Sequence, residues 1–481
     1  MSKRLILILA LAFVVGIAFT AYAEVQNVKV SGDLTVTGVA RNDLTLTKDV
    51  ASTPADFGKK IRAILSQVRV RVDADLTDNV ATTVRLLNER TWGEEMDEPT
   101  TPDSYKTTSN SDIDVDLAYA TMKEFLYSPL SLTVGRQELR FGSGLVVGAR
   151  TTNAIAAGHG KTGRYLPNSL DDLSLRKAFD AIRATLDYNP LVVDLIYSKI
   201  SESNIAAFDD VNLYGANANY AVNKNLVTEG YIFQRARDRG VAVTSTAAAK
   251  KEKLTTVGAK ANYTGLKDTS LGLEGAYQFG DHLRNTTLYP NESISGTTNS
   301  TRKVTAYALQ ATGSYKVPTM TKYAPMLGGS YTYLSGDKAA STNDHFRGWD
   351  SMFEDQNSGT IFNKIFALTN MQIVNLNASA KPIEDVTLTA NYYNLRSAQP
   401  FATEGSLTKT LSNISGDPTY TMKAGKKGLG NEIDLGITYD YTEDVQFGLT
   451  GGAFIPGGAF EKQNAGKETA KQVIGSMKVT F

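Results

Sequence analysis

Apolar and polar residues alternate along segment after segment of this chain. In the segment 66–76, for example, Val68, Val70 and Val72 alternate with Arg69 and Arg71. A period of two places the two kinds of residue on opposite faces of a β-strand. Such a strand cannot lie in an ordinary core, because its second face would bury unpaired charge. The pattern predicts strands with one face in an apolar medium and the other in water.

Eighteen segments carry this pattern, and the segment 226–235 allows either parity. We predict strands at residues 27–42, 66–76, 80–92, 112–123, 130–141, 178–188, 191–199, 210–220, 226–235, 254–263, 270–280, 303–315, 325–335, 371–381, 385–395, 431–441, 445–455 and 472–481.

The connections between these segments alternate between short and long. Short connections such as Thr77-Asp78-Asn79 and Asn189-Pro190 consist of turn-forming residues, whereas the long ones are polar. This alternation is typical of a transmembrane barrel with short periplasmic turns and long extracellular loops. The predicted fold is therefore all-β, a transmembrane antiparallel up-and-down β-barrel of about 18 strands.

The last predicted strand ends the chain on an aromatic residue, Phe481. A closed barrel ties its last strand to its first, which prevents a terminal strand from fraying. We expect residues 472–481 to pair antiparallel with residues 28–40, with Lys478 facing the lumen.

The N-terminus has the pattern of a secretory signal. Lys3 and Arg4 precede an apolar run at residues 5–19, and Ala21-Tyr22-Ala23 matches a signal peptidase site. A retained membrane anchor is the less favoured alternative, because the run is shorter than the ~20 residues of a spanning helix. We predict a signal peptide at 1–23 and a single barrel domain at 24–481, located in the outer membrane of a Gram-negative-type bacterium after cleavage near Ala23.

The composition contains few groups for catalysis. Lys+Arg and Asp+Glu are equal at 50 each, which gives no reason to expect nucleic acid as a partner. The absence of cysteine excludes disulfides and thiol chemistry. His159, His282 and His345 are all expected in loops, without spacing suited to catalysis or metal binding. We expect no enzymatic activity, no cofactor and no metal.

Two stretches resemble the alginate export family of outer-membrane porins. They are LTVGRQELRFGSGLVVG at residues 132–148 and GNEIDLGITYDYTEDVQFGLTGGAFIPGG at residues 430–458. The resemblance implies an eighteen-stranded barrel that acts as a channel.

Several basic residues are expected at one height inside the barrel. At ~3.3 Å per residue and a tilt near 40°, a residue about six positions from a short turn lies ~15 Å above it, near the bilayer midplane. Arg71, Arg85, Arg183 and Lys260 satisfy this condition. We call them the basic belt, and we expect such a belt to focus anions. In the alternative interpretation, unrelated lumenal charges are paired with acidic residues, namely Glu274, Asp434 and Glu89.

The segment 130–141 does not keep apolar residues on one face and polar residues on the other along its whole length. Leu132 and Val134 place the even positions outward, which would turn Arg136 toward lipid at a cost of ~2–4 kcal/mol. A β-bulge near Gly135 would turn Arg136, Glu138 and Arg140 inward and would turn Leu139 and Phe141 outward. We predict that bulge. The pore-lining candidates are then Arg69, Arg71, Arg85, Arg136, Glu138, Arg140, Arg183, Lys260, Glu274 and Asp434.

These features favour a passive porin that carries anionic solutes, either small anions or an acidic saccharide, with the long loop at 142–177 expected to narrow the lumen. The alternatives are an export channel for an alginate-like acidic polysaccharide, an outer-membrane enzyme, and a plugged structural barrel or adhesin. The expected partners are outer-membrane lipid and lipopolysaccharide, the barrel assembly machinery and a small or polymeric anionic solute, but no nucleic acid. A monomer is favoured.

Overall fold

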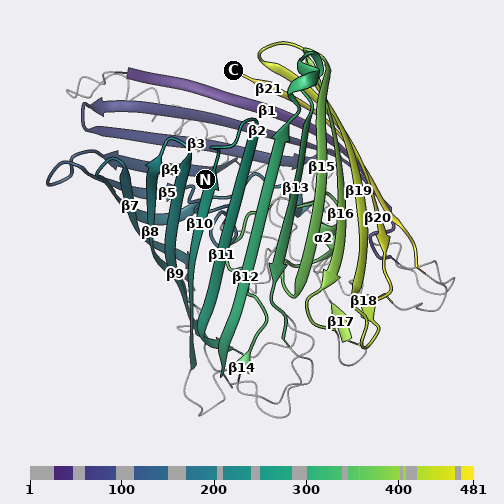
Figure 1. The fold of residues 1–481 in the computed structure, drawn as a ribbon. Helices are drawn as coiled ribbons and strands as arrows, with labels where there is room; N and C mark the ends of the chain where they lie inside the picture. The colour runs from purple at the N-terminus through teal and green to yellow at the C-terminus, as the bar shows by residue number, and fades with distance from the viewer. Residues whose placement is uncertain are drawn as a thin grey trace, which may run out of the picture.

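The alternating segments pair edge to edge into one antiparallel wall, which Figure 1 shows as a tilted barrel. Every predicted strand is present in this computed structural model. The wall strands are β1 (Asn27–Asn42), β2 (Lys60–Thr77), β3 (Val80–Thr91), β4 (Ile113–Met122), β5 (Leu130–Gln137), β6 (Phe179–Asp187), β7 (Leu191–Ser201), β8 (Val211–Asn223), β9 (Leu226–Arg239), β10 (Lys250–Tyr263), β11 (Thr269–Leu283), β12 (Thr301–Lys316), β13 (Met326–Leu334), β15 (Met371–Ile383), β16 (Val386–Ser397), β19 (Gly428–Asp440), β20 (Val445–Pro456) and β21 (Ala470–Thr480).

The structure describes residues 27–46, 60–93, 113–149, 170–202, 210–239, 250–283, 301–337, 345–356, 358–400, 405–407, 420–460 and 467–481. The predicted signal peptide and its cleavage site lie outside these ranges, as does His159. Among the residues described, no helix is long and apolar enough to cross a membrane.

Each wall strand pairs antiparallel with the next wall strand, and β21 closes the wall by pairing with β1. Short turns join the strands at one end of the barrel, which we call the short-turn end. The strand ends that flank the long connections lie at the other end, the long-connection end (Figure 1). Three small strands lie outside this pattern. β14 (His345–Phe346) runs parallel to β12, whereas β17 (Gly405–Leu407) and β18 (Tyr420–Met422) form a separate sheet.

The closure joins the predicted pair of strands antiparallel, with residues 33–42 of β1, instead of 28–40, as the partner of β21. Thr480 lies opposite Asp33, and Lys478 lies opposite Thr35 on the face shared with the buried Gln472. Phe481 adds two backbone hydrogen bonds to Gly32, donating to its carbonyl at 3.0 Å and accepting from its N–H at 2.7 Å. The chain end is therefore tied into the wall, and Lys478 is on the inward face as predicted.

Apolar side chains cover the outer face of the wall. Leu273, Leu309 and Leu435 point outward and are exposed, whereas Glu274 and Gln310 on the inward face are buried. This is the reverse of a soluble protein. It is the arrangement expected where the outer face meets lipid.

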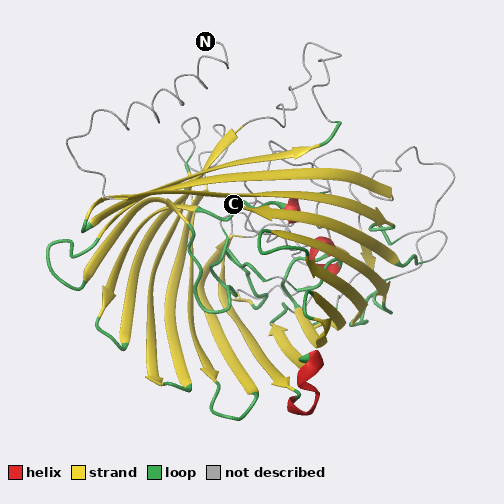
Figure 2. Cartoon of the chain, turned by 90° about the horizontal axis from the view of Figure 1, so that it is seen from above, coloured by secondary structure: helices red, strands yellow, loops and turns green. Residues whose placement is uncertain are grey.

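The barrel encloses an apolar core made of inserted segments, which Figure 2 shows as loops and short helices inside the ring of strands. Three segments form it, and we call them the loop insert (138–149), the short insert (170–177) and the long insert (345–370, described except for residue 357); together they form the plug. The short insert contains η2 (Asp171–Leu173) and the long insert contains α2 (Phe362–Ile365). Buried side chains of the plug include Phe141, Val147, Trp349, Phe353 and Phe362.

The end of one strand and the position of two histidines differ from the prediction. The fifth strand ends at Gln137 instead of continuing to Phe141, because the chain leaves the wall there and enters the barrel. His282 and His345 lie in β11 and β14 and not in loops.

Candidate functional site

The basic belt lies on the inward face of the wall. Arg71 and Arg85 are direct partners in the register of β2 and β3. Arg183 lies on β6 opposite the buried Ile196 of β7, and Lys260 lies on β10 opposite Glu274 and Glu229. The spacing from the short turns thus brings these residues to the inner wall from four strands.

Carboxylates on the wall pair with the arginines of this region. Arg71 Nε lies 2.7 Å from Asp73, Arg183 Nε lies 2.7 Å from Asp194, and Arg69 Nε lies 2.8 Å from Asp33. Because each partner is on the same strand or on an adjacent strand, the ion pairs are part of the wall itself.

The acidic residues named in the alternative interpretation serve the plug instead. Glu274 accepts from the backbone N–H of Ser143 and from the Tyr231 hydroxyl, both at 2.8 Å. Asp434 accepts from the Thr360 hydroxyl at 2.8 Å. These two acids do not neutralise the belt arginines, because their described hydrogen bonds are to the inserted segments and to Tyr231.

The predicted bulge at Gly135 is wrong. The pairing is regular on both sides of β5, with Arg136 opposite Ala118 of β4 and Asp180 of β6. Arg136 therefore shares the outward face with Val134, and its guanidinium lies 3.4 Å from Asp180, an ion pair that offsets part of the cost of this position. The register shift in this region lies between β3 and β4, where Asp116 is the extra residue.

Glu138 and Arg140 reach the interior by another route. They belong to the loop insert, where Glu138 contacts Arg85 and Arg140 lies 2.6 Å from Asp355 of the long insert. Leu139 and Phe141, which we expected to face lipid, are buried in the plug. The inward turn of the main chain after Gln137 replaces the bulge.

Three of the four belt residues hold the loop insert. Arg85 contacts Glu138, Arg183 lies over the Phe141 ring at 5.7 Å from its centroid, and Lys260 donates to the Gly142 carbonyl at 2.9 Å. Glu229 accepts from the Gly142 N–H at 2.8 Å. Residues from four strands thus hold consecutive parts of one loop.

The contacts between the loop insert and the wall require a glycine at position 142. Its φ is +61°, a region that favours glycine, and an added Cβ would lie 2.5 Å from Glu274 Oε1.

Arginine and carboxylate pairs anchor the other two inserts. In the long insert, Asp350 lies 2.6 Å from Arg235 of β9, which also pairs with Glu252 of β10. In the short insert, Asp172 pairs with Arg41 of β1 at 2.5 Å, and Arg176 pairs with Glu89 at 3.0 Å.

Glu432 of β19 holds the long insert in a different way. Its carboxylate accepts three backbone hydrogen bonds, from Thr360 at 2.6 Å, Ile361 at 2.9 Å and Phe362 at 2.6 Å. A wall carboxylate thereby satisfies the N–H groups at the start of α2, which would otherwise be buried without partners.

The inserts also bind one another. Asp355 of the long insert pairs with Arg140 at 2.6 Å and with Lys177 of the short insert at 2.8 Å. The Phe353 N–H donates to the Val146 carbonyl at 2.9 Å. The cavity beside Leu145 and Trp349 has a volume of only about 10 Å³, at the lower limit for one water molecule. The plug is therefore a packed body and not a set of separate loops.

The sequence prediction missed most of these anchors. Arg41, Arg235 and Glu252 lie at inward positions near the long-connection end, and Asp172 and Asp350 lie in connections whose structure the period of two does not specify. The available signal was the apolar content of the long connections, such as Leu145-Val146-Val147 and Trp349.

The plug does not have the features of a metal site. Among the described residues, no group of three or more His, Cys, Asp or Glu side chains could hold a metal ion.

Comparison with solved structures relates this fold to outer-membrane proteins. The crystal structure of Pseudomonas aeruginosa OpdQ matches with a TM-score of 0.51 at 12% identity, covering 95% of this chain and all (100%) of that one. Pseudomonas aeruginosa OccK5 (OpdH) matches at 0.52 and 11% identity (95% and 99% covered), and Acinetobacter baumannii OccAB2 at 0.52 and 10% identity (96% and 99% covered). At these identities the likeness concerns the fold.

Comparison at the level of sequence gives a family. No curated protein matches the sequence. The family model described as alginate export matches residues 56–475, which is most of the chain and includes seventeen of the eighteen wall strands in whole or in large part. The chain therefore belongs to the alginate export family, a family of outer-membrane barrels of the porin type.

Proposed function

We propose that this protein is a passive outer-membrane channel for small anionic solutes, with the long connections outside the cell and the plug narrowing the path. The observation that carries the proposal is the asymmetry of the ion pair on β6 and β7. The Arg183 side chain is 33% exposed, whereas its partner Asp194 is only 5% exposed. A solute that passes this pair meets the cation first.

Of the neighbouring pairs, one has the same asymmetry: Arg69 is 22% exposed against 13% for Asp33. The Arg71–Asp73 pair is balanced at 36% and 34%, and in the Arg85–Glu138 pair the acid is the more exposed partner. Cationic groups on a low-dielectric wall raise the local concentration of anions. Because wall carboxylates partly offset the charge, we expect a preference for anions and not exclusion of cations.

Export of an acidic polysaccharide is the second candidate, and the family description favours it. A polymer would have to pass the plug as an extended chain, and the plug is fixed to the wall and to itself by ion pairs and hydrogen bonds. We therefore place small anions first. A plugged barrel without transport is the third candidate, since the same packing supports it.

Swelling of proteoliposomes tests the proposal. We expect a small organic anion to enter faster than a cation of similar size, by about two- to tenfold. The variant Arg183→Gln should reduce this difference, whereas Lys267→Gln, which removes a charge from the turn between β10 and β11, should not. Entry of the cation at the higher rate would contradict anion preference, and no swelling in any solute would favour a plugged barrel.

A further inference from the structure

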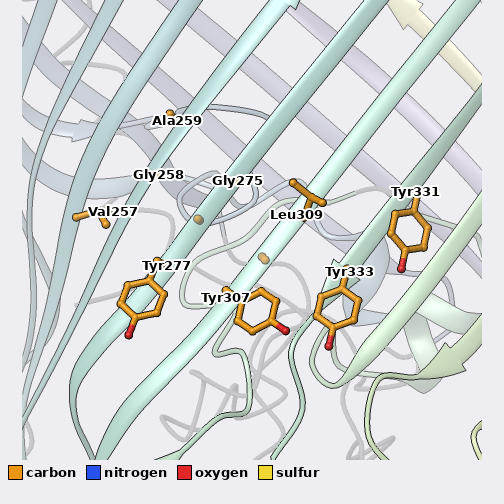
Figure 3. Close-up of a pocket in the computed structure, with 11 residues that line it drawn as sticks. Val257, Gly258, Ala259, Gly275, Tyr277, Tyr307, Leu309, Tyr331 and Tyr333 are labelled. Atoms are coloured by element: carbon orange, nitrogen blue, oxygen red, sulfur yellow. The ribbon is translucent and has the colours of Figure 1, made fainter.

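The outer face of the wall is hollowed over β10 to β13. The groove has a volume of about 790 Å³ and is lined by small residues and by four tyrosines, Tyr277, Tyr307, Tyr331 and Tyr333 (Figure 3). The tyrosines and Leu309 lie on the outward face and are themselves partly exposed. The groove thus opens toward the membrane and not toward the lumen.

The register explains why a hollow forms here. Ala259 lies opposite Gly275, so the floor lacks large side chains at two neighbouring strands. An added Cβ at Gly275 would meet no atom closer than 3.9 Å. The aromatic rings rise around this floor, and those of Tyr307 and Tyr333 stack with centroids 5.4 Å apart and planes at 14°.

The heights of Tyr277 and Tyr333 match one leaflet of the membrane, whereas Tyr331, five residues after Met326, lies lower and near the midplane. Tyr277 lies eight residues after Thr269, the first residue of β11, and Tyr333 lies seven after Met326, the first of β13. At ~3.3 Å per residue and a tilt near 40° these positions are ~18–20 Å above the short turns, in the upper part of an apolar band ~25 Å tall. In the orientation proposed above, this is the outer leaflet.

We propose that this groove binds an acyl chain of lipopolysaccharide from the outer leaflet. The groove is continuous with the lipid-facing surface, so its occupant comes from the surrounding membrane. Its small, apolar floor suits a methylene chain, and the tyrosine hydroxyls near the leaflet boundary suit the polar head of the same molecule. The wall of a second barrel is broad and convex, so it would cover this groove without filling it, whereas a single chain can lie inside it.

Filling the groove tests the proposal. We would measure retention of hexa-acylated lipid A on the purified full-length chain by native mass spectrometry, with phosphatidylethanolamine as the competing lipid. We expect Gly275→Leu to weaken lipid A binding at least tenfold. The matched control is Gly451→Leu, because Gly451 is an outward glycine between Leu435 and Val473 with nothing within 4 Å of an added Cβ.

A second filling variant and a heat-shifted gel migration assay guard against misfolding. If Gly275→Leu does not reach the folded form, Ala259→Leu fills the same groove from β10 and should have the same effect. Tyr307→Phe removes one hydroxyl and should weaken lipid A binding less than either filling variant.

Three results would overturn the proposal. They are unchanged lipid A retention in the folded filling variants, equal retention of phosphatidylethanolamine, and a dimer of the wild type that Gly275→Leu dissociates. The inference rests on the proposed orientation in the outer membrane. Lipid retention and solute passage are measured separately. A negative result for lipid A therefore does not decide whether the protein is a channel for anions.

Discussion

At the scale of single residues, two glycines allow close contacts that a side chain would block. One contact lies where the last residue of the chain packs on the wall, and the other lies where the loop insert packs on the wall. Gly32 lies under the ring of Phe481, and an added Cβ would lie 2.6 Å from the ring and 2.5 Å from the Arg69 carbonyl oxygen. Gly142 allows the turn of the loop insert whose carbonyl accepts a hydrogen bond from Lys260 of the basic belt. The sequence pattern indicated neither role, because each depends on a contact with a distant segment.

We expect Gly32→Ala to weaken barrel closure. The extra methyl must displace the Phe481 ring or the neighbouring strand, at a cost of about 1–3 kcal/mol. The folded fraction after refolding, measured by heat-shifted gel migration, should fall. Gly38→Ala is the matched control on the same strand and face, because its Cβ would have its nearest neighbour, the Gly475 oxygen, at 3.9 Å. Equal losses for both variants would disprove the role of the Phe481 contact.

Gly142→Ala should loosen the loop insert. Alanine at this φ and in contact with Glu274 costs about 1–3 kcal/mol. This cost weakens the contact between the loop insert and the wall and not the pairing of the wall strands. We expect larger or more frequent conductance steps in a planar bilayer. Gly93→Ala controls for strain alone, since Gly93 has φ +81° and nothing within 4 Å of an added Cβ. A closed Gly142→Ala channel, or the same change in both variants, would show that Gly142 does not hold the loop insert in place.

At the scale of elements, periodicity predicted the wall and not its contents. All eighteen strands follow from a local pattern, because the two faces of each strand meet different media along its length. The plug has no such period. Its conformation depends on distant pairs such as Arg235 with Asp350, so the segment 130–141 was extended as a strand past the point where the chain leaves the wall.

We expect Asp350→Asn to release the long insert. Arg235 and Asp350 are both buried, and since Arg235 keeps its pair with Glu252, the loss of the Asp350 charge costs about 1.5–3 kcal/mol. Limited proteolysis of the folded barrel should then cut within 345–370. Asp281→Asn is the control, because its pair with Lys303 is exposed and worth about 0–1 kcal/mol. Resistance of both variants to the protease would show that the buried pair does not hold the plug.

At the scale of the whole molecule, inward-facing residues of the wall also hold the plug. We predicted the belt as a basic constriction at mid-height; Arg85, Arg183 and Lys260 contact the loop insert, and Arg71 and Arg183 retain exposed surface. The spacing from the turns gave the inward positions. It could not give the ion-pair partners, because side-chain pairing depends on the register between strands.

The reversal potential of the wild-type channel under a tenfold KCl gradient tests the proposed anion preference. We predict a potential of the sign set by chloride, smaller than that of an ideally anion-selective pore because wall carboxylates pair with the arginines. A potential of the sign set by potassium would contradict it.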